Sequence, residues 1–411
     1  MNIAVFGIGR VGLPLAIYFA EHGQQVIGVD INADVVNNLQ KGIMPFYEEG
    51  AEELMKKHIN KLFTVTTNSQ EAVKKSDVLI LTLGTPVDEH INPVFSQIEK
   101  VLINIAPHLQ KNQILILRST VSPGATEYLK RFIEKNTKFK VGSDFFLAFC
   151  PERIAQGFSL EELKEIPTII GSLDKESAKR AEAVFRAFSD KIMHTDARSA
   201  ELAKLFTNMY RYINFAIANE FMMLADAHER SIYEIIDLVN KDYKRGGLKV
   251  PGLTAGPCLF KDGFFLINKI PFTELIMNSW KLNESVPAYL IEKIKKTKNL
   301  ENAKAAILGL TFKKNSDDTR NSLSFKAKKI FLAEGAQVAL HDPYINSESI
   351  DKILEGADVV FIAMNHDFYR DMDKDMLKSK VKKDALICDI WNMSGLNKIF
   401  YFAAELQTKK K

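Results

Sequence analysis

Four short apolar segments near the start of the chain recur, in the same order, near its end. In the first half they are residues 3–9, 23–30, 76–82 and 113–120; in the second half they are residues 306–310, 335–342, 357–363 and 385–392. Each is a near-continuous apolar run that ends in a polar or turn residue. This pattern is typical of strands buried on both faces of a parallel sheet. The duplication therefore predicts two sheets of the same kind.

Stretches with helical periodicity, such as residues 13–22 and 325–334, separate these segments. Strands that alternate with helices form βαβ units, so we expect an α/β protein with two doubly wound, Rossmann-like parallel-sheet domains. Residues 197–227 contain neither Gly nor Pro, and their apolar positions follow helical spacing. They predict one long central helix, either a connector with a dimer surface or an intradomain packing helix. The predicted domains are 1–196, 197–285 and 286–411.

Length and composition limit the classes of function. A chain of 411 residues is too long for one core, and 46% hydrophobic with 26% charged residues is typical of a soluble globular protein. The net charge of +4 is scattered, so we expect no nucleic-acid partner. No apolar run is long enough to cross a membrane. Three distant cysteines favour a reducing cytoplasm over a disulfide framework, and the histidines lack metal-ligand spacing.

A GxGxxG fingerprint follows the first predicted strand and precedes a helical segment. It consists of Gly7, Ile8, Gly9, Arg10, Val11 and Gly12. The glycines allow a tight turn and the close approach of a pyrophosphate, and the helix N-terminus adds N–H groups. Asp30 ends the second strand, where a carboxylate can bind the hydroxyls of an adenosine ribose. Because no Arg or Lys stands in the next four residues to neutralise a 2′-phosphate, NAD is favoured over NADP.

The second half lacks this fingerprint. Its corresponding turn, residues 309–314, reads GLTFKK. Lys313 and Lys314 in this turn, together with Arg320, suit a different phosphate ligand.

The segment PGLTAGPCLFKD, residues 251–262, carries the strongest candidate nucleophile, Cys258. A cysteine before a helix start, with Lys261 nearby, is expected to be partly thiolate, and Asp262 would share its helical face. Lys204 and Asn208 have the same four-residue spacing on the long helix. Each also has an ordinary interpretation: a buried small thiol for Cys258 and a solvated surface amine for Lys204.

Two further polar residues follow apolar runs. Glu152 comes after residues 145–149, where a carboxylate is either a general base for hydrolysis or an ordinary loop charge. Thr120 ends the fourth strand segment of the first half, at the edge where such sheets bind ligands.

Taken together, these blocks resemble the UDP-glucose/GDP-mannose dehydrogenase family over almost the whole chain. Each motif is weak alone, but their number and order are specific. The matching stretches are 7–12, Asp30, 84–86, 119–124, 151–154, 201–204, Asn208, 256–258, 261–262, 309–313, 318–320 and 342–343.

The resemblance implies an NAD-dependent, four-electron oxidation of the C6 hydroxyl of a nucleotide-activated hexose. Two NAD⁺ and one water would give a uronic acid for surface polysaccharide biosynthesis, through a thiohemiacetal and a thioester on Cys258. The resemblance also implies a cytoplasmic homodimer that takes a UDP-sugar as substrate.

The resemblance implies roles for individual residues. Lys204 would stabilise oxyanions, and Asn208 would help to hold the substrate. Asp262 would handle protons and position water with Thr120, and Glu152 would assist hydrolysis of the thioester. Further NAD contacts would come from Thr85, Thr120, Gln156, Lys261 and Arg320. Substrate contacts would come from Glu152, Lys204, Asn208, Arg245, Gly256, Phe312 and Lys313.

The chain departs from the family pattern at the loop before Cys258, which has fewer glycines and is one residue shorter, so its sugar contacts are expected to differ. Gln156 stands where UDP-glucose members often have a second glutamate. Residues 151–157, PERIAQG, look more like members that act on UDP-N-acetylhexosamines. UDP-N-acetylmannosamine or UDP-N-acetylglucosamine is therefore favoured, and UDP-glucose 6-dehydrogenase activity, which makes UDP-glucuronate, is the alternative.

Three other classes of function remain open at this point. A two-electron hydroxyacid dehydrogenase accounts for the first sheet and the long helix, but leaves the second sheet and Cys258 without a role. A nucleotide-sugar epimerase would use a Tyr-x-x-x-Lys pair such as Tyr289 and Lys293, which lies far from the first sheet and is interpreted as chance. An NAD-binding regulatory protein would bind NAD without oxidising any nucleotide sugar.

Overall fold

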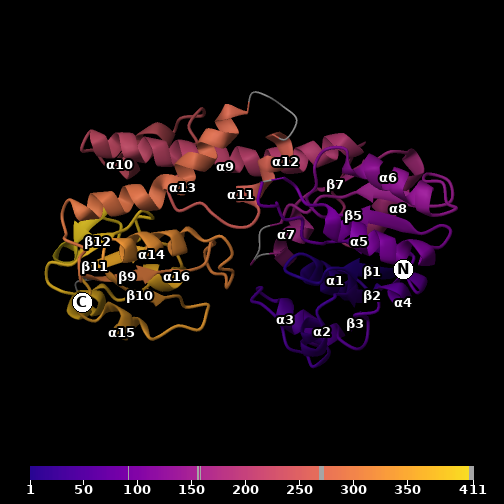
Figure 1. Cartoon of the computed structure of the whole chain (residues 1–411), viewed down its shortest axis with the longest axis horizontal. Coiled ribbons are helices and arrows are strands. Elements are labelled where there is room, and N and C mark those ends of the chain that lie inside the picture. Colours follow the sequence, from indigo (N-terminus) through magenta and orange to yellow (C-terminus); the bar gives the residue numbers. More distant parts are fainter. Residues whose placement is uncertain (91, 155–156, 158, 268–272, 407–411) are drawn as a thin grey trace. The chain divides into compact units, whose positions relative to one another are not determined.

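The structure is a computed structural model, and it describes residues 1–90, 92–154, 157, 159–267 and 273–406. The chain forms two compact units, whose helices and strands are labelled along the ribbon in Figure 1. The first unit contains Met1–Thr207 and Lys261–Pro271, and the second contains Asn208–Phe260 and Phe272–Lys411. Among the described residues, no helix is both long and apolar enough for a transmembrane span.

The first unit contains an eight-stranded sheet in the order β3-β2-β1-β4-β5-β6-β7-β8. Its strands are β1 (Asn2–Phe6), β2 (Gln25–Val29), β3 (Phe63–Thr66), β4 (Val78–Leu81), β5 (Ile114–Leu117), β6 (Phe146–Phe149), β7 (Thr168–Ser172) and β8 (Ile192–Asp196). The first six follow the strand order of dinucleotide-binding folds. Phe6 pairs with both Val29 and Leu81, so the loops after β1, β2 and β4 leave the sheet at one edge.

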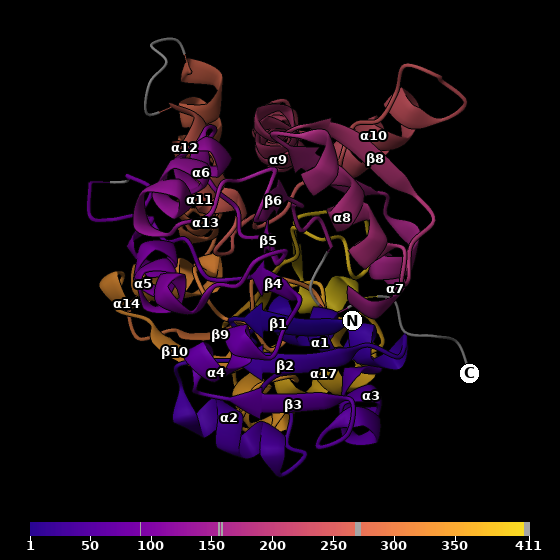
Figure 2. The ribbon, with the colours of Figure 1, turned by 90° about the vertical axis from the view of Figure 1, so that its right-hand side faces the viewer.

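Helices cover both faces of this sheet because alternate side chains of each strand point to opposite faces. Ile3 and Val5 pack in one core cluster, whereas Ala4 and Phe6 pack in the other. The first cluster includes α1 (Gly12–Glu21), α2 (Ala33–Gln40), α3 (Ala51–His58), α7 (Ser159–Glu165) and α8 (Lys175–Phe185). The second includes α4 (Ser69–Lys74), α5 (Ser96–Ile105) and α6 (Ala125–Asn136). Figure 2 shows α7 and α8 on the opposite side of the strands from α4 and α5.

The second unit contains a five-stranded sheet in the order β10-β9-β11-β12-β13. Its strands are β9 (Lys304–Leu308), β10 (Gln337–His341), β11 (Val359–Ile362), β12 (Leu386–Cys388) and β13 (Phe400–Phe402). One face packs on α10 (Ile232–Asn240), α13 (Glu274–Lys295) and α14 (Leu323–Ala333); the other packs on α15 (Ile350–Leu354), α16 (Asp367–Arg370) and α17 (Lys374–Lys380). The duplicated α/β sheet predicted from the repeated segments is therefore confirmed.

The two sheets are not wholly parallel. β7 runs antiparallel to β6, and β13 runs antiparallel to β12. The repeated segments include neither β7 nor β13, so the duplication gave no information on their direction. The predicted segments match β1, β2, β4 and β5 of the first sheet and β9 to β12 of the second, whereas β3, β6 and β8 were not among them.

The long helix predicted for residues 197–227 is α9 (Ala197–Ala227), which contributes residues to both units. In the first unit, buried Glu201 on α9 accepts hydrogen bonds from the N–H groups of Gly124 (2.6 Å) and Thr126 (2.8 Å) and from the Thr126 hydroxyl (2.6 Å). Burial raises the pKa of this carboxyl, although these hydrogen bonds act in the opposite direction. Glu201 thus fixes the start of α6 and the loop after β5. The division of the sequence into three domains stays a prediction.

Candidate active site

The turn after β1 has the geometry that a dinucleotide pyrophosphate requires. Gly7 has a φ of +90°, and a Cβ on Gly12 would lie 2.1 Å from the Gly7 carbonyl oxygen, so α1 can begin this close only with glycine. The first turn of α1 carries no acidic side chain, so no carboxylate of this turn competes with a bound anion for its backbone N–H groups. Asp30 follows β2 and accepts a hydrogen bond from the Asn32 N–H (3.0 Å). These residues fit NAD.

Two other predicted residues of this turn, Arg10 and Val11, are half-buried. The Arg10 guanidinium lies 4.9 Å from the centre of the Phe46 ring. Gln156, also predicted to contact NAD, lies outside the described residues.

Three residues predicted to contact NAD lie together in the first unit. The Lys261 ammonium, on the short helix α11 (Leu259–Asp262), donates to the carbonyl and the hydroxyl of Thr85, the latter at 3.0 Å. The Thr85 hydroxyl in turn donates to the Thr120 carbonyl at 2.7 Å. Because Thr85 and Thr120 follow β4 and β5, this cluster lies beyond the carboxyl ends of the strands, next to the point where the strand order reverses.

Glu152 follows β6 and is held from two sides. One carboxylate oxygen accepts hydrogen bonds from the N–H groups of Arg153 (2.7 Å) and Ile154 (2.9 Å). The other accepts from Arg118 Nε (2.8 Å), and Arg118 also donates to the Cys150 carbonyl (3.2 Å). Sequence reasoning missed Arg118, although a cation at the end of an apolar strand, two residues before Thr120, was a usable signal. The orientation of Glu152 is set by Arg118.

The three cysteines differ in access. Cys258 is exposed, whereas Cys150 and Cys388 are buried. Burial raises the pKa of the Cys150 thiol to about 12, and it raises the pKa of the Cys388 thiol well above the ordinary value. Cys258 is therefore the thiol that can meet a substrate at neutral pH.

A cation lies within electrostatic reach of Cys258 in the second unit. Arg320 donates to both carboxylate oxygens of Asp318, from Nε at 2.9 and 3.2 Å. These hydrogen bonds raise the pKa of the Arg320 guanidinium, and the negative charge of the Cys258 thiolate raises it further. The Cys258 sulfur and the Arg320 guanidinium are therefore electrostatically coupled.

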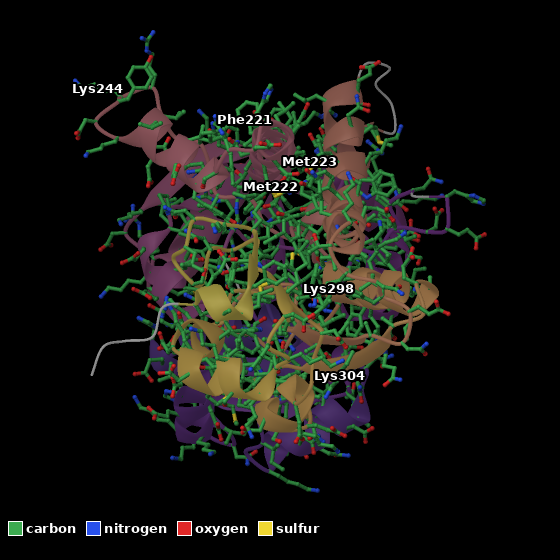
Figure 3. The ribbon with its side chains drawn as sticks, turned by 90° about the vertical axis from the view of Figure 1, so that its left-hand side faces the viewer. Phe221, Met222, Met223, Lys244, Lys298 and Lys304 are labelled. Atoms are coloured by element: carbon green, nitrogen blue, oxygen red, sulfur yellow. The ribbon has the colours of Figure 1, made fainter. Side chains whose placement is uncertain are left out.

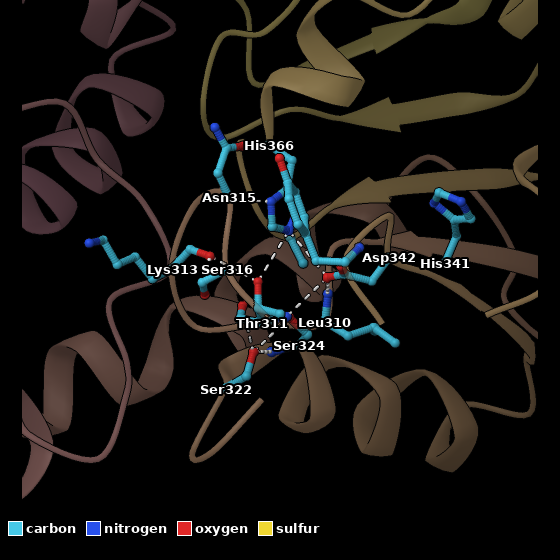
Figure 4. Close-up of polar contacts among 12 residues, drawn as sticks. Leu310, Thr311, Lys313, Asn315, Ser316, Ser322, Ser324, His341, Asp342 and His366 are labelled. Carbon is cyan, nitrogen blue, oxygen red and sulfur yellow. Dashed lines mark hydrogen bonds and ion pairs between the residues drawn. The ribbon is translucent and has the colours of Figure 1, made fainter. Parts of the chain in front are cut away.

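The loop after β9 is fixed by a buried polar network, drawn in Figure 4. Asp342, at the end of β10, accepts from the N–H groups of Leu310 (2.6 Å) and Thr311 (3.2 Å). His366 Nδ1 accepts from the Asn315 N–H (2.9 Å), so its ring proton lies on Nε2, which faces Asp342 Oδ2 at 3.2 Å. Burial alone would raise the pKa of Asp342, but His366 and the backbone N–H groups lower it overall.

This network lies beyond β9 and β11, where the order of the second sheet reverses and ligands bind in open α/β sheets. Figure 4 shows the Lys313 side chain extending away from the network. Lys313 is therefore presented by a rigid loop and suits the phosphates of a nucleotide. Sequence reasoning missed His366, because nothing near it in the sequence marks its contacts with a loop some 50 residues away.

Phe312, on the same loop, packs against Gly256. A Cβ on Gly256, which has a φ of +106°, would lie 2.4 Å from the Phe312 ring. The structure thus brings together two of the residues predicted to contact substrate.

The remaining predicted substrate and catalytic residues are placed as follows. Lys204 and Asn208 are buried on α9, and Asp262 is buried at the end of α11. Arg245 is exposed on the loop after α10, with its guanidinium 5.2 Å from the centre of the Tyr243 ring.

The Tyr-x-x-x-Lys pair has a different environment from that of an epimerase site. The Tyr289 hydroxyl donates to Asp226, and Lys293 forms an ion pair with the same carboxylate. Burial and Asp226 raise the pKa of Tyr289. A catalytic tyrosine base needs the opposite shift, so this pair has a structural role.

Comparison with known proteins agrees with this arrangement. Residues 1–189 match the NAD binding domain of the UDP-glucose/GDP-mannose dehydrogenase family, residues 198–286 its central domain, and residues 306–395 its UDP binding domain. The UDP-N-acetyl-D-mannosamine dehydrogenase of Methanocaldococcus jannaschii is 34% identical over 96% of this chain and 95% of its own length.

Solved structures are similar over nearly the same length. The UDP-D-ManNAc dehydrogenase from Pyrococcus horikoshii has a TM-score of 0.86 at 33% identity, over 93% of each chain. The UDP-N-acetyl-mannosamine dehydrogenase Cap5O from Staphylococcus aureus has a TM-score of 0.85 at 31% identity, over 96% of this chain and 95% of that one. The chain thus belongs to the UDP-glucose/GDP-mannose dehydrogenase family and is an NAD-dependent nucleotide-sugar dehydrogenase.

Proposed function

We propose that this enzyme oxidises the C6 hydroxyl of a UDP-N-acetylhexosamine, with UDP-N-acetylmannosamine as the first candidate, to the uronic acid through covalent intermediates on Cys258. The observation that carries the proposal is one exposed thiol within electrostatic reach of the Arg320 guanidinium, while the other two thiols are buried. The names of the relatives support the choice of sugar. UDP-glucose remains the alternative substrate.

The proposed reaction proceeds in four steps. Loss of a hydride and a proton from the C6 alcohol gives an aldehyde, and the Cys258 thiolate adds to its carbonyl carbon to form a thiohemiacetal. Loss of a second hydride and a proton gives a thioester. Water then breaks the C–S bond, releasing the carboxylic acid and the thiol. Bound NAD⁺ would supply the hydride acceptor for both oxidations, so two NADH would form for each sugar.

The other predicted site residues would divide the remaining work. The Lys204 ammonium, placed in a largely dry environment, would stabilise the oxyanions of both tetrahedral species. Asp262 would handle protons and position water with Thr120, and Glu152, held by Arg118, would assist hydrolysis of the thioester. Asn208 and Arg245 would contact the substrate, whose diphosphate would lie at Lys313. Thr85, Lys261 and Arg320 would contact NAD.

The proposed assembly is a homodimer formed through the second unit. Exposed apolar residues follow one face of α9 at seven-, four- and three-residue spacing; they are Tyr210, Ile217, Phe221 and Leu224. Figure 3 labels Phe221, which is 45% exposed, beside buried Met222. A continuous apolar seam on a long helix suits a second copy of the same helix. Three thiols without disulfides fit a reducing cytoplasm.

The first prediction concerns the stoichiometry. The wild-type enzyme is expected to release two NADH for each UDP-N-acetylmannosamine, measured by absorbance at 340 nm against uronic acid. Cys258→Ser removes the thiolate and should lower acid formation by about 10³-fold or more. Cys388→Ala, which changes a buried thiol, should keep both the rate and the ratio of two. A wild-type reaction that ends at one NADH and the aldehyde would contradict the four-electron mechanism.

The second prediction concerns thiol reactivity. At pH 8, a Cys150 thiol with a pKa of about 12 is roughly 10⁻⁴ ionised, and Cys388 is shifted in the same direction. Iodoacetamide should therefore modify one cysteine per native chain, Cys258, and all three after denaturation, as counted by peptide mass spectrometry. Modification of Cys150 or Cys388 at a comparable rate in the native protein would count against the assignment.

The third prediction concerns Asp342. Its folded-state pKa is lowered, so the ionised carboxylate stabilises the fold above the unfolded pKa of about 4, and this contribution disappears as the pH falls through the folded value. Asp342→Asn should lower the free energy of unfolding at pH 7 by about 1–3 kcal/mol, with the deficit shrinking below pH ~4.

The same substitution should raise the KM for the UDP-sugar about tenfold and leave the KM for NAD unchanged, because Asp342 fixes the Lys313 loop. Asp371→Asn, at an exposed position, is the control for both measurements. Equal changes in both KM values would show that Asp342 does not act through the nucleotide loop.

The fourth prediction concerns the dimer. Phe221→Glu places a charge in the proposed seam and should convert a dimer to a monomer at micromolar concentration in sedimentation velocity. Leu332→Glu, at a 50% exposed apolar position on α14, should leave the dimer intact. A wild-type protein that sediments as a monomer would rule out the seam.

A further inference from the structure

The loop before Cys258 is clamped at its start by one side chain. Asn219, buried on α9, accepts a hydrogen bond from the Gly252 N–H (2.9 Å) and donates one to the Gly252 carbonyl (3.1 Å). Asn219 also donates to Asn283 on α13 (2.9 Å). A Cβ on Gly252 would lie 2.3 Å from the Trp391 ring, so the indole closes over this peptide.

A second clamp holds the end of the same loop. The Gly256 N–H donates to the Asn321 carbonyl at 3.3 Å. The Phe312 ring occupies the space that a side chain at Gly256 would need. The segment from Gly252 to Gly256, with three residues between the glycines, therefore has both ends fixed within the second unit, immediately before the proposed nucleophile.

The middle of this interval carries a hydroxyl with no visible use in the fold. Leu253 and Ala255 pack into the apolar core of the second unit. Thr254 between them is only 6% exposed, and among the described residues its Oγ1 has no hydrogen-bond partner. Burying an unsatisfied hydroxyl costs free energy that a valine of the same shape avoids. The presence of a buried hydroxyl that lowers stability is explained if a ligand supplies its hydrogen-bond partner.

We propose that the Thr254 hydroxyl forms a hydrogen bond with the hexose of the nucleotide sugar and helps to determine which sugar is oxidised. The inference rests on the proposed function. Thr254 stands four residues before Cys258, so their Cα atoms lie at most about 14 Å apart, and a hexose with C6 at the thiol would bind next to this loop. A ring hydroxyl or an acetamido group of the sugar supplies the missing partner.

The test compares three variants with the wild type, using UDP-N-acetylmannosamine, UDP-N-acetylglucosamine and UDP-glucose as substrates. Thr254→Val removes only the hydroxyl, and Thr254→Ser retains it. Ser76→Ala is the matched control, because Ser76 is 4% exposed and its Oγ also lacks a partner among the described residues, but it stands before the amino end of β4.

Thr254→Val should melt at the same or a higher temperature than the wild type, yet show kcat/KM for the sugar lowered about 10- to 100-fold, with the KM for NAD unchanged. Thr254→Ser should remain within about threefold of the wild type. Ser76→Ala should match the thermal behaviour without a kinetic change.

Unchanged kcat/KM in Thr254→Val, for a wild type that oxidises the sugar, would overturn this inference and leave the proposed function standing. A lower melting temperature of Thr254→Val would also overturn it, because the hydroxyl would then have a structural partner. A wild type that oxidises none of the three sugars would instead overturn the proposed function, and the inference with it.

Discussion

The site depends on one constraint: an irregular loop that is buried must find partners for its backbone N–H and C=O groups. Asn219 satisfies both groups of Gly252, and Asn321 accepts from Gly256 at the other end of the same loop. An unpaired backbone group in this position would cost about 1–3 kcal/mol. Because both ends are satisfied, Cys258 can be exposed while the chain leading to it stays buried and rigid. Precise placement of a nucleophile requires such support.

An aspartate follows the second strand in both of the duplicated sheets, but its contacts differ between them. Asp30 and Asp342 both follow the second strand of their sheets. In the first sheet, the glycine turn leaves space for a dinucleotide, and Asp30 lies where a ribose binds. In the second sheet, the turn has no GxGxxG, and Asp342 binds the turn itself through Leu310 and Thr311. The aspartate that would bind a ribose in one half thus stabilises, in the other half, the loop that is proposed to bind the diphosphate.

Much of the fold follows from local sequence patterns. The strands that match the repeated segments are near-continuous apolar runs. α9 spans the stretch without Gly or Pro that predicted it. The antiparallel strands β7 and β13 were not predicted, because their direction depends on which neighbour they pair with and leaves no mark on a short apolar segment.

The site residues also fall into a group that the sequence predicted and a group that it did not. Short motifs predicted the glycine turn, Thr85, Thr120 and Lys261, and Thr85 forms hydrogen bonds with both Lys261 and Thr120. Arg118, Asn219 and His366 were missed because each acts on residues more than 30 positions away. Burial of a polar side chain and the identity of its partner are properties of the folded chain, and no spacing rule encodes them.

The loop before Cys258 has fewer glycines than the family pattern, and its packing shows the physical consequence of this difference. A glycine-rich loop presents backbone groups to a ligand and loses much conformational entropy on folding. In this chain the interval between Gly252 and Gly256 carries Leu253, Thr254 and Ala255. Leu253 and Ala255 attach the loop to the core, which restricts its motion. A more rigid loop would adapt less to different sugars, which agrees with the proposed role of Thr254 in the choice of sugar.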